Sequence, residues 1–264
     1  MCTVIILRRP GHDWPLLLAA NRDEMRDRPW RAPGRHWPDR PEVFAGLDLL
    51  AGGSWLGIND HGVAAAILNR RNSLGPAPGL RSRGELVLDA LDHADARAAA
   101  TALADLDARA YRSFNLLVAD DTDAIWIRAL GPDGPPRPEA RPIGAGLSMI
   151  TAADLDDLTD PRIGHHLPLW RATPVPDPER GDWEGWERRL ASRESPGDGR
   201  GAMTFLLDSG FGTVSSALVA LPATIRRRRG PPAFRFAEGH PDAIVWRDLG
   251  VGPAAVATQP KRTV

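Results

Sequence analysis

Short apolar runs occur in pairs along the first half of the chain, and turn residues separate the two members of each pair. The first pair, for example, is joined through Pro10, Gly11, His12 and Asp13, which are residues that favour turns. Two strands with a short connection form an antiparallel hairpin. We expect three such hairpins, formed by residues 2–7 with 16–21, 53–59 with 62–69, and 114–119 with 124–129.

Two helices are expected between the second and third hairpins. Residues 83–91 and 94–106 place leucines at helical spacing among alanines and charged residues. Ser82 and Glu85 have the spacing of a capping box at the start of the first helix. Strand pairs around a helical block predict an α+β fold with antiparallel sheets. Further strands are expected at residues 212–221, 233–236 and 243–246, and a proline-rich loop at residues 131–142.

The composition excludes several classes of protein. Lysine plus arginine total 33 and aspartate plus glutamate total 34, so the formal net charge is −1 and general nucleic-acid binding is not expected. No apolar run is long enough for a transmembrane helix, and the first apolar run precedes its charges, Arg8 and Arg9, unlike a secretory signal. We expect a cytoplasmic protein with one domain at residues 1–251 and a flexible tail at residues 252–264.

Cys2 is the single cysteine, which excludes an internal disulfide and a cysteine-based zinc site. Removal of Met1 would place an α-amino group beside its thiol, and the reference pKa values of these groups are about 7.7 and about 8.5. The amine would then serve as the base for its own nucleophile. The alternative is a buried cysteine that packs as a small apolar residue.

The first hairpin brings charged residues close to Cys2. A turn centred near residues 11 and 12 makes paired positions add to about 23, which sets Cys2 opposite Asn21. Strand alternation then sends Asn21 and Asp23 to one face and Arg22 and Glu24 to the other. A guanidinium beside the thiol favours the thiolate. The alternative is a solvated, charged strand end.

Two further residues are candidates for the same site. Trp55 lies between small residues and is suited either to wall a pocket or to fill a core. Asn69 ends the second strand of the second hairpin, and its side-chain amide could donate to an oxyanion. An ordinary asparagine at a strand end is the alternative.

The chain contains six motifs in the same order as the NRDE family, which it therefore resembles. This family is also called the transport and Golgi organisation protein 2 family. The resemblance covers roughly residues 1–150. It implies the four-layer αββα sandwich of N-terminal-nucleophile hydrolases, and similarity to their cysteine-dependent group of penicillin V acylases and bile salt hydrolases. The motifs are Cys2, Asn21-Arg22-Asp23-Glu24, Gly52-Gly53-Ser54-Trp55-Leu56-Gly57, Asn69-Arg70, Ser82-Arg83-Gly84-Glu85-Leu86 and Phe114-Asn115-Leu116-Leu117.

The resemblance also implies roles for single residues. Cys2 corresponds to the nucleophile, Arg22 and Asp23 to its supporting charges, and Asn69 to an oxyanion donor. Two positions depart from the family pattern, because Met149 stands where asparagine is common and Val214 where arginine is common.

The leading expectation for function is what the family resemblance implies, an intracellular protein that binds and traffics haem or a similar amphipathic acid. Cys2 would then offer a thiolate, Arg22 would pair with a propionate, and Trp55 would wall the ring. The alternative is a cysteine amidohydrolase that cleaves a linear amide, and a further alternative is the handling of acyl-CoA or lipid. We expect a small-molecule ligand, with haem as the candidate, no required cofactor and no metal site.

Overall fold

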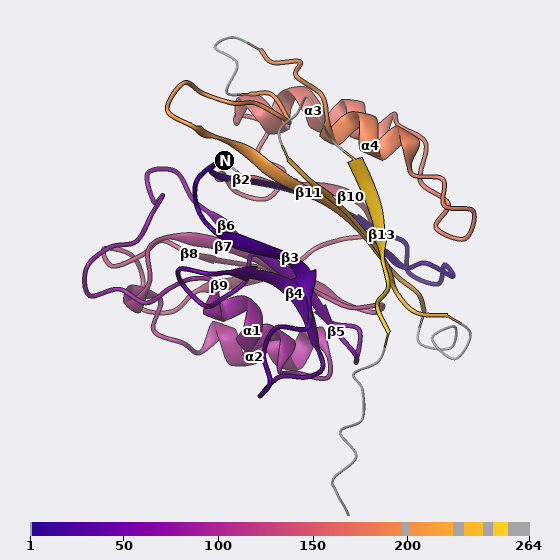
Figure 1. Cartoon of the computed structure of the whole chain (residues 1–264). Coiled ribbons are helices and arrows are strands. Elements are labelled where there is room, and N and C mark those ends of the chain that lie inside the picture. Colours follow the sequence, from indigo (N-terminus) through magenta and orange to yellow (C-terminus); the bar gives the residue numbers. More distant parts are fainter. Residues whose placement is uncertain (1, 197–200, 224–229, 240–244, 253–264) are drawn as a thin grey trace, which may run out of the picture.

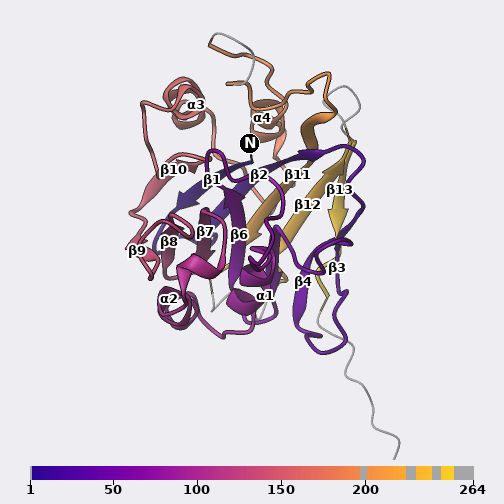
Figure 2. The ribbon, with the colours of Figure 1, turned by 90° about the vertical axis from the view of Figure 1, so that its left-hand side faces the viewer.

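The structure is a computed structural model that describes residues 2–196, 201–223, 230–239 and 245–252. The predicted tail, apart from Gly252, and the first two residues of the strand predicted at 243–246 lie outside these described residues. Two antiparallel sheets form the centre of the molecule (Figures 1 and 2). The first sheet has the order β10-β1-β2-β11-β12-β13, with the bounds β1 (Thr3–Arg8), β2 (Leu16–Met25), β10 (Gly146–Ile150), β11 (Phe211–Leu221), β12 (Ala233–Glu238) and β13 (Val245–Leu249).

The second sheet runs in sequence order, because each of its strands pairs with the next one along the chain. It contains the second and third predicted hairpins as neighbouring pairs. Its strands are β3 (Trp30–Gly34), β4 (Val43–Asp48), β5 (Leu56–Asn59), β6 (Ala64–Asn69), β7 (Phe114–Ala119), β8 (Ala124–Ala129) and β9 (Glu139–Pro142).

Helices cover the outer face of each sheet (Figure 1). The helices α1 (Glu85–Leu91) and α2 (Ala96–Ala104) pack on the second sheet, and a short 3-10 helix η1 (Ala108–Ala110) follows them. The helices α3 (Pro161–Arg171) and α4 (Glu184–Leu190) pack on the first sheet. The four layers are therefore helix, sheet, sheet and helix, which confirms the predicted αββα sandwich.

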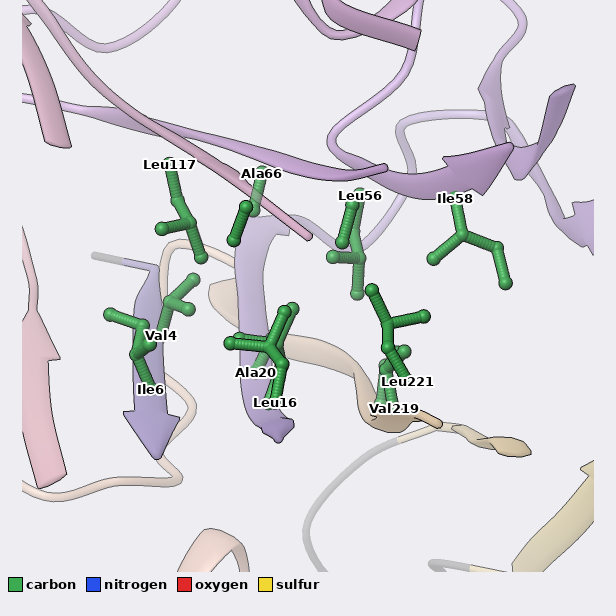
Figure 3. Packing of buried hydrophobic residues seen from close by; sticks show 14 of the residues in the cluster. Val4, Ile6, Leu16, Ala20, Leu56, Ile58, Ala66, Leu117, Val219 and Leu221 are labelled. Carbon is green, nitrogen blue, oxygen red and sulfur yellow. The ribbon is translucent and has the colours of Figure 1, made fainter. Parts of the chain in front are cut away.

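Strand alternation divides the apolar residues between two kinds of core. On β1, Val4 and Ile6 point to the space between the sheets, while Ile5 points to α3 and α4. On the second sheet, Leu56 and Ile58 face the first sheet across this central core (Figure 3). Cys2 follows the same alternation as Val4 and packs against the central core.

The β1–β2 register differs by one residue from the prediction. Thr3 pairs with Asn21, so Cys2 is not opposite Asn21. The reason lies in the turn, which spans seven residues and is closed by a hydrogen bond from the Arg9 amide to the Pro15 carbonyl (2.8 Å). An odd number of turn residues centres the hairpin on His12 and moves the pairing along by one position.

Two local predictions were wrong. The capping box does not form, because α1 begins after Gly84 and the hydroxyl of Ser82 accepts the Gly84 amide instead (3.3 Å). Glu85 accepts a hydrogen bond from the hydroxyl of Tyr111 (2.6 Å). The predicted loop at residues 131–142 ends in the edge strand β9, which pairs with β8.

Candidate functional site

A polar cavity of about 220 Å³ opens beside the start of β1. Both sheets contribute to its wall, together with the segment that precedes α1. All five predicted residues line it, namely Cys2, Arg22, Asp23, Trp55 and Asn69. Other residues that line the cavity include Glu24, Arg28, Asp48, Arg81, Ser82, Arg83, Gly84 and Arg112.

Cys2 lies half-buried in this pocket and contacts the main chain of β2. Its sulfur accepts a hydrogen bond from the Asp23 amide (3.4 Å) and the thiol donates to the Asp23 carbonyl (3.5 Å). Burial raises the pKa of the thiol, the negative charge of Asp23 raises it further, and the opposing effect of Arg22 is smaller. Arg22 does act in the expected direction, toward the thiolate, but desolvation outweighs the guanidinium and the pKa of Cys2 is raised.

Arg22 points from β2 into the space between the sheets. Its guanidinium carbon lies 4.2 Å from the ring centroid of Trp55, which is cation–π distance. Nη2 is 3.7 Å from the nearest carboxylate oxygen of Asp48, but Arg28 holds that carboxylate more closely, at 2.7 Å. Nη1 is buried and makes no hydrogen bond to any described residue, although the Arg22 side chain is only 5% exposed. Arg22 thus presents an unpaired cationic donor to the pocket.

Asp23 directs its carboxylate to the opposite face of β2, as strand alternation predicts. The hydroxyl of Thr213 donates to Oδ1 (2.7 Å), and Nη1 of Arg162 lies 3.2 Å from Oδ2. The same Arg162 nitrogen donates to the hydroxyl of Thr3 (2.9 Å). The contacts anchor Asp23 between β11 and α3, directly beneath the main chain that holds Cys2.

Trp55 forms a wall of the pocket and is only half-buried. Its ring packs edge-on against Trp30, with 5.7 Å between the centroids and an angle of 87°. On its far side, a Cβ at Gly46 would lie 2.4 Å from the indole ring, so only glycine leaves room for this placement. Asn69, at the end of β6, lines the pocket and its side chain makes no hydrogen bond within the described part of the chain.

Arg83 is a pocket residue to which the sequence analysis gave no role. The segment that contains Arg83, residues 82–86, packs closely against the segment 52–57. An added Cβ at Gly53 would lie 2.4 Å from the carbonyl carbon of Gly84. Nη1 of Arg83 donates to the carbonyls of Ser73 (2.7 Å) and Ser113 (3.0 Å). Burial, and then the charge of Arg112, lowers the pKa of Arg83 to about 10.

The other residues that sequence reasoning missed are Arg162 and Thr213. They lie 139 and 190 residues from Asp23 along the chain, so no local spacing connects them to it. The two departures from the family pattern do not line the pocket. Met149 is buried under α3 and α4, and Val214 lies at the β11 bulge between Thr213 and Ser215.

The described residues contain no group of three histidine, cysteine, aspartate or glutamate side chains placed to hold a metal ion. Among the helices in these ranges, none combines the length and apolarity that crossing a membrane requires.

Comparison with known proteins identifies relatives of the N-terminal part. The sequence profile described as "Transport and Golgi organisation 2" matches residues 1–152. The homologue of this name from Bos taurus is 38% identical over 114 residues, which cover 40% of this chain and 38% of the relative. The Homo sapiens homologue is 36% identical over 112 residues, with the same shares of each chain. The chain therefore aligns with less than half of the length of these relatives.

Solved structures show the same fold at low sequence identity. A Caenorhabditis elegans N-acylethanolamine-hydrolyzing acid amidase ortholog has a TM-score of 0.55 at 14% identity, covering 88% of this chain and 98% of its own. A variant of the conjugated bile acid hydrolase from Clostridium perfringens has a TM-score of 0.51 at 10% identity, covering 96% and 98%. With the fold of N-terminal-nucleophile hydrolases and the matching profile over its first 152 residues, this chain belongs to the Transport and Golgi organisation 2 family.

Proposed function

We propose that the protein is a cysteine amidohydrolase of the N-terminal-nucleophile type that cleaves a linear amide. The observation that carries this proposal is the position of Cys2, whose sulfur lies against the Asp23 main chain in a pocket shared with Arg22 and Asn69. The fold supports it, because similar structures include amidases. That similarity, at 14% identity, concerns the fold and not the substrate.

The raised pKa of the Cys2 thiol means that the nucleophile needs a nearby base. In the proposed mechanism Met1 is removed, and the freed α-amine of Cys2, with an ordinary pKa of about 7.7, accepts the thiol proton. The role proposed for the carboxylate of Asp23, which Thr213 and Arg162 hold in place, is to stabilise the resulting ammonium. Burial disfavours a thiolate in the resting protein, but it still permits a thiolate that forms only during the reaction.

The sulfur then attacks the amide carbon and forms a tetrahedral intermediate. Its oxyanion accepts hydrogen bonds from the Asn69 amide and from Nη1 of Arg22, the donors that have no other partner among the described residues. The C–N bond breaks as the ammonium returns its proton to the leaving amine, which leaves a thioester on Cys2. Water hydrolyses this thioester to a carboxylic acid and restores the thiol.

The size of the pocket limits what it encloses. Sites that bury a drug-sized ligand usually measure about 300–1,000 Å³, and this cavity measures about 220 Å³. We therefore propose that the pocket holds the scissile amide and a short group beside it, while the rest of the substrate stays outside.

Hydrolysis is tested with purified protein whose intact mass shows whether Met1 is present. A panel of N-acyl amides is incubated with wild type, Cys2→Ala and Cys2→Ser protein, and the released acids are measured by mass spectrometry. We expect cleavage only by protein that lacks Met1, a covalent acyl adduct on Cys2, and no cleavage by Cys2→Ala. Cleavage at the wild-type rate by folded Cys2→Ala protein would contradict the proposal.

Binding of haem or another amphipathic acid is the second candidate function. The unpaired Nη1 of Arg22 beside the ring of Trp55 favours it, because a carboxylate next to a flat apolar group fits this pair. The cavity volume and the protonated thiol weigh against a fully enclosed, thiolate-ligated haem. Haem titration of wild type, Cys2→Ala and Arg22→Ala, followed by absorbance, tests it. Equal and unsaturable titrations would indicate adsorption only.

A further inference from the structure

Two arginines in the pocket, Arg83 and Arg112, have only main-chain and hydroxyl partners. Nη1 of Arg83 donates to the Ser73 and Ser113 carbonyls, and Nη1 of Arg112 donates to the Leu74 carbonyl (2.6 Å). Among the described residues, neither guanidinium forms an ion pair with a carboxylate. Carbonyl dipoles hold these groups in place, but they do not neutralise the positive charges.

The neighbouring arginines of the same pocket are different. Arg28 is paired with Asp48 at 2.7 Å, and Arg81 is paired with Glu85 at 2.6 Å. Arg22, although its Nη1 has no hydrogen-bond partner, still lies 3.7 Å from a carboxylate oxygen of Asp48. Among the described arginines of this pocket, a carboxylate at ion-pair distance is therefore missing at Arg83 and Arg112. These two also act on each other, since the charge of Arg112 lowers the pKa of Arg83.

Arg83 keeps more free donors than Arg112, whose Nη1 and Nη2 both donate to carbonyls, Nη2 to that of Asn72 (2.9 Å), so that its Nε is the donor with no hydrogen bond to a described residue. Arg83 uses Nη1 for its short bonds, Nη2 reaches the carbonyl of Gly75 only at 3.5 Å, and Nε makes no hydrogen bond within the described residues. A guanidinium with free donors on one edge matches a carboxylate, which accepts two parallel N–H groups. Cys2 lines the same cavity, so an anion bound here lies within a short molecule's length of the thiol.

We infer that Arg83 and Arg112 bind a carboxylate of the substrate, and that the substrate is a linear amide with a carboxylate a few bonds from the scissile amide. The inference rests on the proposed function and names its substrate class. The carboxylate belongs either to the amine part, as in an N-acyl amino acid, or to the acyl part, as in a dicarboxylic acid monoamide. Both sources present the same group to the arginines.

The test measures binding to Cys2→Ala protein by calorimetry, so that no turnover is needed. N-hexanoylglycine is compared with neutral N-hexanoylethanolamine, and the monohexylamide of glutaric acid is compared with the hexylamide of 5-hydroxypentanoic acid. The members of each pair differ by a carboxylate against a hydroxymethyl group. We expect the acid of one pair to bind about 10- to 100-fold more tightly than its neutral partner. The pair that shows this preference identifies the source of the carboxylate.

Variants assign the preference to the two arginines. Arg83→Gln and Arg112→Gln, each in the Cys2→Ala background, should reduce it at least tenfold, and Arg83→Lys should retain part of it because the charge remains. Arg97→Gln is the matched control, since Arg97 is exposed on α2 and paired with Asp123. Circular dichroism shows whether each variant is folded. If Arg83→Gln does not fold, the test uses Arg112→Gln together with the salt dependence of acid binding, which a charged contact should show.

The outcomes separate this inference from the proposed function. Equal affinities for the acid and neutral members of both pairs would overturn the carboxylate site. Cleavage of neutral and acidic amides at equal rates would support the hydrolase and reject the site. A preference that depends on Arg83 and Arg112, without cleavage of any amide by wild type, would support the carboxylate site and reject hydrolysis.

Discussion

Arg22 and Asp23 are neighbours in sequence, yet their charged groups leave β2 in opposite directions. Arg22 meets Trp55 in the pocket, and Asp23 meets Arg162 and Thr213 on the side of the helices. Alternation along a strand predicted this separation, and it could be stated before the structure because it needs only local geometry. The partners of Asp23 could not be predicted, because they come from distant parts of the chain.

The titration of Cys2 should respond to these two neighbours in opposite directions. Asp23 raises the pKa of the thiol and Arg22 lowers it, so Asp23→Asn should shift iodoacetamide alkylation to lower pH and Arg22→Gln should shift it to higher pH. Because Cys2 is the single cysteine, the mass gained on alkylation reports this residue alone. Rates are measured from pH 6 to pH 10 on protein of one defined N-terminus. Slower alkylation of Asp23→Asn at every pH would contradict the assigned charge effects.

At the scale of secondary-structure elements, the contact between the start of β5 and the start of α1 has no room for a side chain. Gly53→Ala would bring a Cβ within 2.4 Å of the Gly84 carbonyl carbon, so the backbone of one element must move. We expect a loss of about 1–3 kcal/mol in the free energy of unfolding, measured with urea, and weaker ligand binding through displaced Arg83. Gly144→Ala is the control, because its Cβ would meet no atom within 4 Å.

Helix α3 should weaken in acid. His166 is buried, its Nε2 donates to the carbonyls of Glu194 and Gly201 (3.1 Å each), and burial, followed by the charge of His165, lowers its pKa to about 4. Since the ordinary pKa is about 6.5, the unfolded chain binds this proton first as the pH falls. The folded protein should therefore lose up to about 3 kcal/mol between about pH 6.5 and pH 4 from this residue.

Urea unfolding at several pH values measures this loss of stability in acid. His166→Gln, which keeps a donor near Nε2, should show a smaller loss over the same pH range, although its stability at pH 7 is lower. His61→Gln on the surface is the control variant. An equal pH dependence for wild type and His166→Gln would exclude this histidine as the cause.

Helix α3 also shows why elements with weak local signals are missed. Its sequence contains Gly164 and, inside the helix, Pro168, both of which disfavour helix formation. Ile163, Leu167 and Trp170 are nevertheless fully buried against the first sheet. Packing on the sheet stabilises a helix that local propensity does not predict, whereas the β1–β2 hairpin was predictable because adjacent residues and a turn specify it.

For the whole molecule, the core between the two sheets should dominate stability. Ile58 is fully buried there, so Ile58→Ala should lower the free energy of unfolding by about 2–5 kcal/mol. Leu50→Ala is the control, because Leu50 is 67% exposed and its truncation should change stability by less than about 0.5 kcal/mol. Chemical unfolding of both variants measures the difference. Equal effects would mean that the sheets are not held together by this core.

The sandwich itself was predicted from the hairpins and the family resemblance, but the order of strands within the sheets was not. β2 pairs with β11, where Leu16 lies opposite Leu221, and no local pattern in the chain links two strands so far apart. The single domain at residues 1–251 and the roles of Cys2, Arg22, Asp23, Trp55 and Asn69 stay predictions. The meeting of Cys2, Arg22, Trp55 and Asn69 in one pocket follows from which strands become neighbours.

The seven-residue turn before β2 fixes more than the shape of a hairpin. A one-residue deletion there that slips the pairing would rotate every side chain of β2 to the other face of the sheet. Arg22 would enter the helical layer and Asp23 the pocket, although neither residue had changed. Pro10 to Asp13 are exposed, so packing does not fix their side chains, although Gly11 has a φ of 81° that favours glycine. Apart from Gly11, natural selection on this segment should therefore act on its length more than on its composition.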